Sequence, residues 1–203
     1  MSDQVITQWV NAAIGGDQDA FAEIVYTFQD AVYNLCYRML GESVEAEDAA
    51  QEAFLKAYYH LDRYDPERSF KTWLLSIASN HCIDRLRKRR MTWVSIDEPT
   101  PATLALSSDE PQPEQVALQR EYSQQMQDLL DELEPDYRAA VILRYWYDYS
   151  YAEIAEITDS TESAIKSRLY RARQFLAEQI QSREGASVAR NPRRGSGSRL
   201  AVD

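Results

Sequence analysis

Apolar side chains recur at intervals of three and four residues along most of this chain, and this spacing predicts an all-α fold. The first long example covers residues 20–40 and ends at Gly41, a residue type that commonly terminates helices. No segment alternates apolar and polar residues as a half-buried strand does. The same periodicity predicts helices over residues 46–61, 70–90, 115–134, 136–147, 151–157 and 161–180.

The helical periodicity is interrupted by a stretch rich in proline and carboxylate residues, which divides the chain into two small helical domains. The stretch contains Pro99, Pro101, Pro111, Pro113, Asp97, Glu98, Asp109 and Glu110. Such a composition is typical of a flexible linker. We therefore expect a first domain over residues 1–91, an acidic linker over 92–115, a second domain over 116–181 and a disordered basic tail over 182–203.

Cysteine, histidine and hydropathy patterns exclude several protein classes. Cys36, Cys82, His60 and His81 share no metal-ligand spacing, so we expect no zinc, no other cofactor and no disulfide framework. The chain does not open with a basic start followed by an apolar stretch. Its run over residues 139–143 is far shorter than the ~20 apolar residues of a membrane span. We expect a soluble, cytoplasmic protein that inserts no segment into a membrane.

Positive charge is concentrated in two clusters, although the 203-residue chain carries a net charge of −11. The clusters consist of Arg85, Arg87, Lys88, Arg89 and Arg90, and of Lys166, Arg168, Arg171 and Arg173. Either cluster alone is equally consistent with a solvated helix face. Two clusters on an acidic body favour a protein that touches a polyanion at defined patches and is repelled elsewhere.

Residues 150–173 have the pattern of a helix-turn-helix. Ser150 and Glu153 have the spacing of a capping box, which begins a helix. Asp159 falls where the turn commonly has a positive φ, and Ser160 can cap the second helix. The apolar residues of that second helix fall on one face: Ile165, Leu169, Ala172 and Leu176.

The opposite face of that second helix has the composition of a recognition helix for the DNA major groove. Glu162 either accepts a hydrogen bond from a cytosine amine or only favours the helix N-terminus. An ordinary helical hairpin is the alternative interpretation. The candidate DNA contacts are Thr161, Ser163, Lys166, Ser167, Arg168, Tyr170, Arg171 and Arg173.

Three stretches resemble bacterial sigma-70 family RNA polymerase sigma factors. Residues 46–58 (AEDAAQEAFLKAY) and 64–87 (YDPERSFKTWLLSIASNHCIDRLR) closely resemble sigma region 2. The segment that begins at residues 133–144 (LEPDYRAAVILR) is similar to region 4. The resemblance covers roughly residues 5–180, and the compact two-domain form looks like the extracytoplasmic-function (ECF) subfamily.

The resemblance implies roles for named residues. The surface that docks on the coiled coil of the polymerase β′ subunit is matched by Asp48, Gln51, Glu52 and Lys56. From the residues alone, these positions are equally consistent with the solvent-exposed face of an amphipathic helix. The loop over residues 62–69 matches one that captures a base flipped from the −10 element, and the helix after it matches the −10 reading helix. The implied −10 contacts are Arg63, Tyr64, Arg68, Lys71, Asn80, Asp84, Arg85 and Lys88.

The family implies a factor that binds core polymerase through the β′ coiled coil and the β subunit and directs promoter-specific initiation. Its helix-turn-helix would read −35 duplex DNA, its acidic linker would approach the nucleic-acid channel of polymerase, and an anti-sigma factor would be a further partner. The alternatives are a stand-alone helix-turn-helix regulator and an antagonist of a sigma factor. We expect no enzyme, because the chain lacks a Gly-rich phosphate loop and the motifs H-E-x-x-H and G-x-S-x-G.

Overall fold

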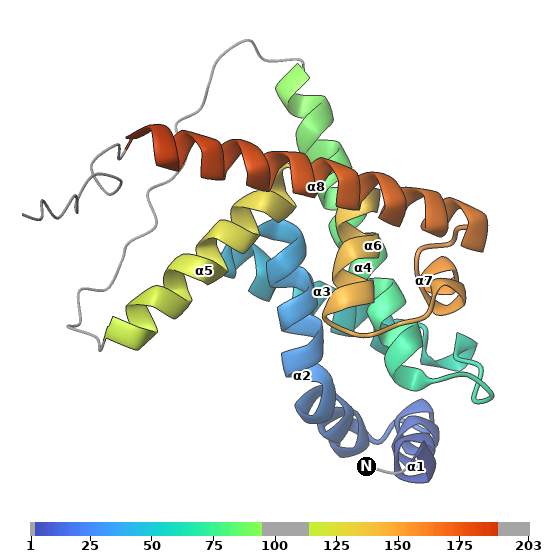
Figure 1. Cartoon of the computed structure of the whole chain (residues 1–203). Coiled ribbons are helices and arrows are strands. Elements are labelled where there is room, and N and C mark those ends of the chain that lie inside the picture. Colours follow the sequence, from blue (N-terminus) through green and yellow to red (C-terminus); the bar gives the residue numbers. More distant parts are fainter. Residues whose placement is uncertain (1–2, 95–113, 191–203) are drawn as a thin grey trace, which may run out of the picture.

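A computed structural model describes residues 3–94 and 114–190 of the chain (Figure 1). Every regular element in these ranges is a helix, which confirms the all-α prediction. The first half contains α1 (Asp3–Ile14), α2 (Gln18–Leu40), α3 (Ser43–Tyr59), a 3-10 turn (Leu61–Arg63) and α4 (Phe70–Val94). The second half contains α5 (Glu114–Asp131), α6 (Pro135–Tyr145), α7 (Tyr151–Ile157) and α8 (Glu162–Arg190).

Two helical segments differ from the prediction. The sequence reading did not include α1, although Val5, Trp9 and Val10 carry a helical spacing there. Helix α8 continues through Arg190, beyond residue 181, where we expected the second domain to end. The rest of the tail and the linker over residues 95–113 lie outside the described residues.

Helix α2 is the centre of the first half. Its residues Ile24, Val32, Leu35 and Met39 have no exposed surface. Helix α3 presents a row of buried alanines to it, and these small side chains let the two backbones approach closely. Helices α1 and α4 pack on the remaining faces of α2. Gly41 ends α2 with a φ of 82°, as predicted.

Helices α7 and α8 form the predicted helix-turn-helix. The capping box between Ser150 and Glu153 is present, and Asp159 has a φ of 46°. The side chain of Thr161, not that of Ser160 as predicted, caps α8 by accepting a hydrogen bond from the backbone N–H of Ala164 at 3.2 Å. Ser160 instead accepts a bond from the Arg168 guanidinium at 3.1 Å.

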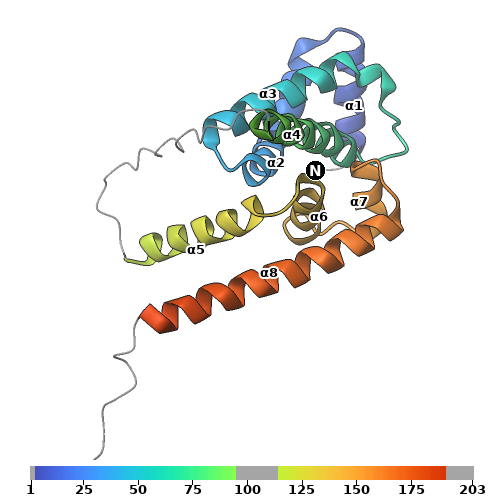
Figure 2. The same ribbon diagram turned by 90° about the horizontal axis from the view of Figure 1, so that it is seen from above.

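The two halves pack against each other. Helix α7 lies on α4, and α6 lies against both α2 and α4, so that the buried apolar residues of the two halves form one continuous core. Figure 2 shows α6 and α7 between the first half and α8, which is on the far side. A linker of the predicted kind permits the domains to separate, but in this structure they are closed on each other.

Candidate polymerase and nucleic-acid interfaces

The four residues expected to dock on polymerase share one exposed face of α3. Asp48, Gln51, Glu52 and Lys56 all face solvent, because their spacing of three and four residues repeats with the helix. The exposed Leu55 lies among them and adds an apolar contact, with 51% of its surface accessible. The structure therefore brings this predicted set together as one surface, which we call the α3 face.

Two residues of the α3 face also touch α4. A carboxylate oxygen of Asp48 lies 4.0 Å from the guanidinium of Arg85, and Lys56 Nζ lies 2.7 Å from His81 Nδ1. Arg85 is itself a predicted −10 contact. The α3 face is therefore joined by polar contacts to the helix that is expected to read DNA.

His81 links α4 to the α3 face through Lys56, a contact that the sequence did not indicate. Burial and the neighbouring Lys56 and Arg85 lower the pKa of its imidazole, although Glu52 and Asp84 oppose this shift. Its Nε2 is buried without a hydrogen-bond partner. A helical register places His81 beside the α3 face, but only the packing of α3 on α4 gives it Lys56 as a partner.

The loop over residues 62–69 is folded by its own hydrogen bonds. The Tyr64 hydroxyl donates to the backbone carbonyl of Arg68 at 2.6 Å. The Tyr64 ring meets Phe70 edge-on, with ring centroids 5.1 Å apart, and lies 5.4 Å from Trp73. Tyr64 is thus half-buried in an aromatic cluster at the start of α4, while Arg63 and Arg68 are exposed.

Three of the predicted −10 contacts are bound to the second half of the molecule. Arg68 forms an ion pair with Glu156 of α7 at 2.5 Å. Asn80 Nδ2 donates to the backbone carbonyl of Ile157 at 3.3 Å, and Lys71 Nζ lies 5.7 Å from the centre of the Tyr147 ring. The closed arrangement therefore engages these three side chains, although all three remain exposed.

Three further predicted −10 contacts, Asp84, Arg85 and Lys88, lie along α4, away from α7. Asp84 and Lys88 are exposed, and Asp84 lies 3.9 Å from Arg87. Arg85 is half-buried beside Asp48. The structure thus places these residues on one helix, but not in one continuous open surface.

Polar contacts hold the closed arrangement at its edges. Arg87 of α4 donates two hydrogen bonds to the carboxylate of Asp136, at 2.8 and 3.0 Å. Arg90 is hydrogen-bonded to Glu134, and this bond lowers the pKa of the Glu134 carboxyl. The Tyr147 hydroxyl donates to the backbone carbonyl of Ala31 in α2 at 2.6 Å.

The recognition face of α8 remains uncovered. Helix α8 packs on α6 and α7, and the predicted contacts on its other side face solvent. Arg168 is the exception, because its guanidinium turns inward to Ser160 and lies 3.5 Å from Asp136, so the expectation that it faces outward is wrong. The exposed members are Thr161, Ser163, Lys166, Ser167, Tyr170, Arg171 and Arg173.

A search of the described residues finds no group of three or more His, Cys, Asp or Glu side chains placed to hold a metal ion. Cys36 and Cys82 are fully buried in the core of the first half. Among the described helices, none combines the length and apolar character that a membrane span requires.

Known proteins resemble this chain in both halves. A family model for sigma-70 region 2 matches residues 24–92, and a model for sigma-70 region 4 matches residues 123–176. The ECF RNA polymerase sigma factor SigW of Bacillus subtilis is 38% identical over 184 residues, which cover 88% of this chain and 98% of that protein. The ECF RNA polymerase sigma-E factor of Escherichia coli K12 is 33% identical over 187 residues, which cover 89% and 95%.

A solved structure has a similar fold. It is a co-crystal structure of the sigma factor RpoE in complex with the anti-sigma factor NepR from Bartonella quintana. The match has a TM-score of 0.62 at 25% sequence identity and covers 79% of this chain and 96% of that one.

Proposed function

This chain belongs to the ECF subfamily of the sigma-70 family and is an RNA polymerase sigma factor, and from this premise we propose which of its surfaces meets each partner. The α3 face binds the β′ coiled coil of core polymerase, and the β subunit supplies a further contact. The loop over residues 62–69 together with α4 captures the melted −10 strand, while the outer face of α8 reads the −35 duplex.

The exposure of the α3 face in the closed molecule is the observation that carries this proposal. Asp48, Gln51 and Glu52 face solvent and contact no described residue of the second half, whereas Arg68 and Asn80 among the −10 candidates are bound to α7. Core polymerase can therefore dock on the closed molecule before DNA does. The acidic and amide groups of the α3 face suit a basic helical partner, because opposite charges favour encounter and fix register.

DNA contact through α4 requires the second half to move away. Asn80 can read a base edge with two hydrogen bonds only after it leaves the carbonyl of Ile157, and Arg68 can position a phosphate only after it leaves Glu156. A single strand would then lie against the aromatic cluster at the start of α4, since stacking on aromatic rings is how unpaired bases are held.

The −35 contact needs no such movement. Lys166, Arg171 and Arg173 are exposed on α8 and can reach phosphates, while Ser163 and Ser167 lie on the same helix and can face the base edges. Free protein should bind duplex DNA weakly because the chain is acidic, with a net charge of −11. Polymerase would raise the affinity by holding the two DNA-binding halves at a fixed spacing.

An anti-sigma factor is the regulatory partner that we propose, and the cytoplasm, where transcription takes place, is the expected location. Sigma factors are initiation factors, so the chemistry of RNA synthesis belongs to polymerase and we propose no reaction for this chain.

The hypothesis that the acidic linker enters the nucleic-acid channel concerns residues outside the described ranges. A stand-alone regulator is not favoured, because it has no use for the α3 face.

Co-elution with core polymerase in gel filtration tests the proposal. We expect the wild-type chain to co-elute and an Asp48→Arg/Glu52→Arg variant to run alone. A Glu23→Arg/Asp30→Arg variant is the matched control, since it makes the same charge change at two exposed acids of α2. If both variants co-elute like the wild type, the α3 face is not the docking surface.

A further inference from the structure

Helix α3 carries a row of apolar side chains on its exposed side. Val44, Leu55 and Tyr59 are 62%, 51% and 73% exposed, although each is a large apolar or aromatic residue. A helix turns about 100° per residue, so these three positions fall within an arc of roughly 60°. We call these three residues the outer row.

The core of the protein does not account for the outer row. The opposite side of α3 packs on the core, where its alanines and Phe54 are buried. A helix that packs on one side ordinarily has polar residues on the other. Exposed apolar side chains that gather on one face are typical of a site of protein contact. Figure 2 shows α3 and α8 on opposite sides of the molecule, so a partner on α3 leaves α8 open to DNA.

The outer row is continuous with the α3 face. Val44 precedes Asp48 and Gln51 by one and two turns on the same side of the helix, and Leu55 and Tyr59 follow at the next two turns. The polar groups therefore lie between one apolar side chain at the start of α3 and two at its end. In such an arrangement, apolar anchors that become buried supply most of the affinity, while the charged groups fix register.

Both ends of the outer row are held in place before a partner binds. The Tyr59 ring meets the Tyr58 ring edge-on, with centroids 5.9 Å apart, and Tyr58 packs in the same way on Phe21 of α2 at 4.9 Å. At the other end, the backbone N–H of Val44 donates to the carboxylate of Glu42, which caps α3, at 3.3 Å. Groups that are already ordered lose little freedom on binding, which favours affinity.

The length of the outer row defines the shape of the partner. Val44 and Tyr59 are about 22 Å apart along the helix axis, at 1.5 Å per residue. A partner that meets both ends must present apolar side chains over about four helical turns. It must also bring basic groups to Asp48 and Glu52. A helix that lies along α3, with apolar residues at spacings of three and four and basic residues beside them, satisfies both conditions.

We infer that Val44, Leu55 and Tyr59 are the apolar anchors of the polymerase contact, and that a helix of the β′ coiled coil lies along the whole of α3. This inference rests on the proposed function and deepens it, since Val44 and Tyr59 lie outside the four residues that the family resemblance assigns to this contact. It makes affinity for polymerase depend on the two ends of α3 as well as on its polar middle.

The test titrates the fluorescently labelled full chain with core polymerase and follows anisotropy at several salt concentrations. Val44→Ala/Tyr59→Ala should weaken binding by about tenfold or more, because truncation of buried anchors removes much of the affinity of an interface. The salt dependence should match that of the wild type, since no charge changes. Tyr26→Ala and Ile14→Ala are the controls, because they truncate side chains of α2 and α1 that are 76% and 51% exposed, and both should bind like the wild type.

Three results would overturn the inference alone. The first is wild-type affinity in Val44→Ala/Tyr59→Ala while Asp48→Arg/Glu52→Arg fails to co-elute, because docking would then be confined to the polar middle of α3. The second is an equal loss of affinity in the control variants, and the third is a changed salt dependence in the anchor variant. Failure of the wild type to bind core polymerase would instead overturn the proposed function.

Discussion

At the scale of single residues, Arg138 joins three helices through its hydrogen bonds. It is 5% exposed and lies on α6. Its guanidinium donates to the backbone carbonyls of Met39 and Asp131, at 2.6 and 2.7 Å, and to the Asp131 carboxylate at 2.8 Å. Burial lowers the pKa of Arg138, and Asp131 opposes that shift. One side chain thus ties α6 to the ends of α2 and α5.

Replacement of Arg138 should therefore destabilise the whole protein. We expect Arg138→Met to lower the free energy of unfolding by about 3 kcal/mol. The substitution leaves buried carbonyl oxygens and a carboxylate without the donor that Arg138 supplies. Urea denaturation followed by circular dichroism measures this loss. Arg63→Met, at an exposed position in the 3-10 turn, should change stability by less than about 0.5 kcal/mol. Equal losses in the two variants would contradict the role given to Arg138.

His81 should make stability sensitive to mild acid. Its pKa in the folded state is lowered by burial and by Lys56, so the unfolded chain takes up a proton first as the pH falls. Stability is then fully present above the ordinary histidine pKa and declines below it, by at most about 1.4 kcal/mol per pH unit. Urea midpoints between neutral pH and the start of carboxylate titration should fall in the wild type and stay flatter in His81→Gln. A parallel decline in both proteins would count against this explanation.

At the scale of elements, the helix-turn-helix depends on its caps. The Ser150 hydroxyl accepts from the backbone N–H of Glu153 at 3.3 Å, and the Glu153 carboxylate accepts from the backbone N–H of Ser150 at 2.8 Å. These bonds satisfy N–H groups that the first turn of α7 leaves open. The Ser150 hydroxyl also donates to the Glu153 carboxylate at 2.6 Å, and this bond, together with the one from the Ser150 backbone N–H, lowers the pKa of the Glu153 carboxyl.

Removal of this cap should weaken the second half. Ser150→Ala should lower the free energy of unfolding by about 1 kcal/mol, the usual value of an N-cap. Thermal unfolding monitored by circular dichroism gives the change. Ser163→Ala removes a hydroxyl from an exposed position inside α8 and should have almost no effect. A cap variant as stable as this control would show that tertiary packing alone fixes α7.

Element positions were predictable where one face of a helix is buried. Ile165, Leu169 and Ala172 repeat at helical spacing, and all three are buried as expected. The end of α8 was misplaced because no core residues mark it, and α1 was missed because a short terminal helix gives few repeats. The choice of Thr161 over Ser160 as the cap depends on where Arg168 turns, which the local sequence does not determine.

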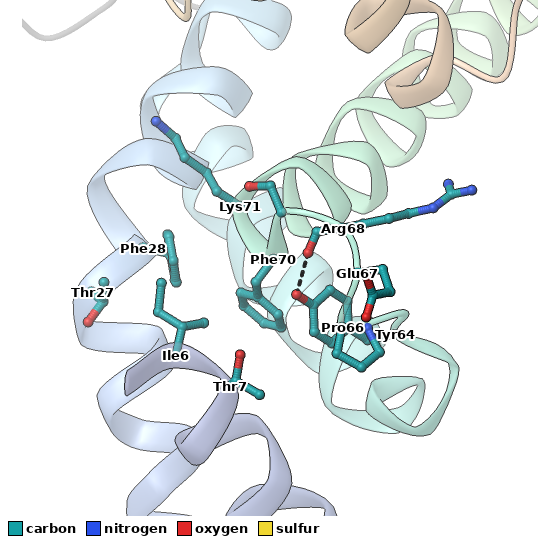
Figure 3. Close-up of a pocket in the computed structure, with 11 residues that line it drawn as sticks. Ile6, Thr7, Thr27, Phe28, Tyr64, Pro66, Glu67, Arg68, Phe70 and Lys71 are labelled. Carbon is teal, nitrogen blue, oxygen red and sulfur yellow. Dashed lines mark hydrogen bonds between the residues drawn. The ribbon is translucent and has the colours of Figure 1, made fainter. Parts of the chain in front are cut away.

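At the scale of the whole molecule, the packing of the two halves against each other could not be predicted from the sequence. The ion pair between Arg68 and Glu156 joins residues that are 88 positions apart, and no local pattern marks either as a partner of the other. The candidate sites divide in the same way. The α3 face follows from the spacing of one helix, whereas the cavity between α1, α2 and the loop before α4 needs three segments that only the fold brings together (Figure 3).

Closure should compete with −10 binding, so that conditions which weaken the interface expose α4. Within the described ranges, three ion pairs cross this interface, made by Arg68, Arg87 and Arg90. Salt screens such exposed pairs, since the Debye length falls from ~30 Å at 0.01 M to ~3 Å at 1 M. Small-angle X-ray scattering of the free chain should show the radius of gyration rising with salt. A wild type already extended at low salt would contradict the closed state.

A double variant separates this competition from general charge effects. Glu134→Gln/Glu156→Gln removes the partners of Arg90 and Arg68 across the interface, whereas Glu132→Gln/Glu178→Gln makes the same change within the second half. Exposed ion pairs are individually weak, so the interface variant should bind a single-stranded −10 oligonucleotide more tightly without polymerase, by roughly a few-fold. Fluorescence anisotropy measures both affinities.

Because the Arg90 bond lowers the pKa of Glu134, that carboxylate stabilises closure above its ordinary pKa and loses this effect as the pH falls through the lowered value. The advantage of the interface variant should therefore shrink in acid, and an advantage that is independent of pH would assign it to something other than these ion pairs.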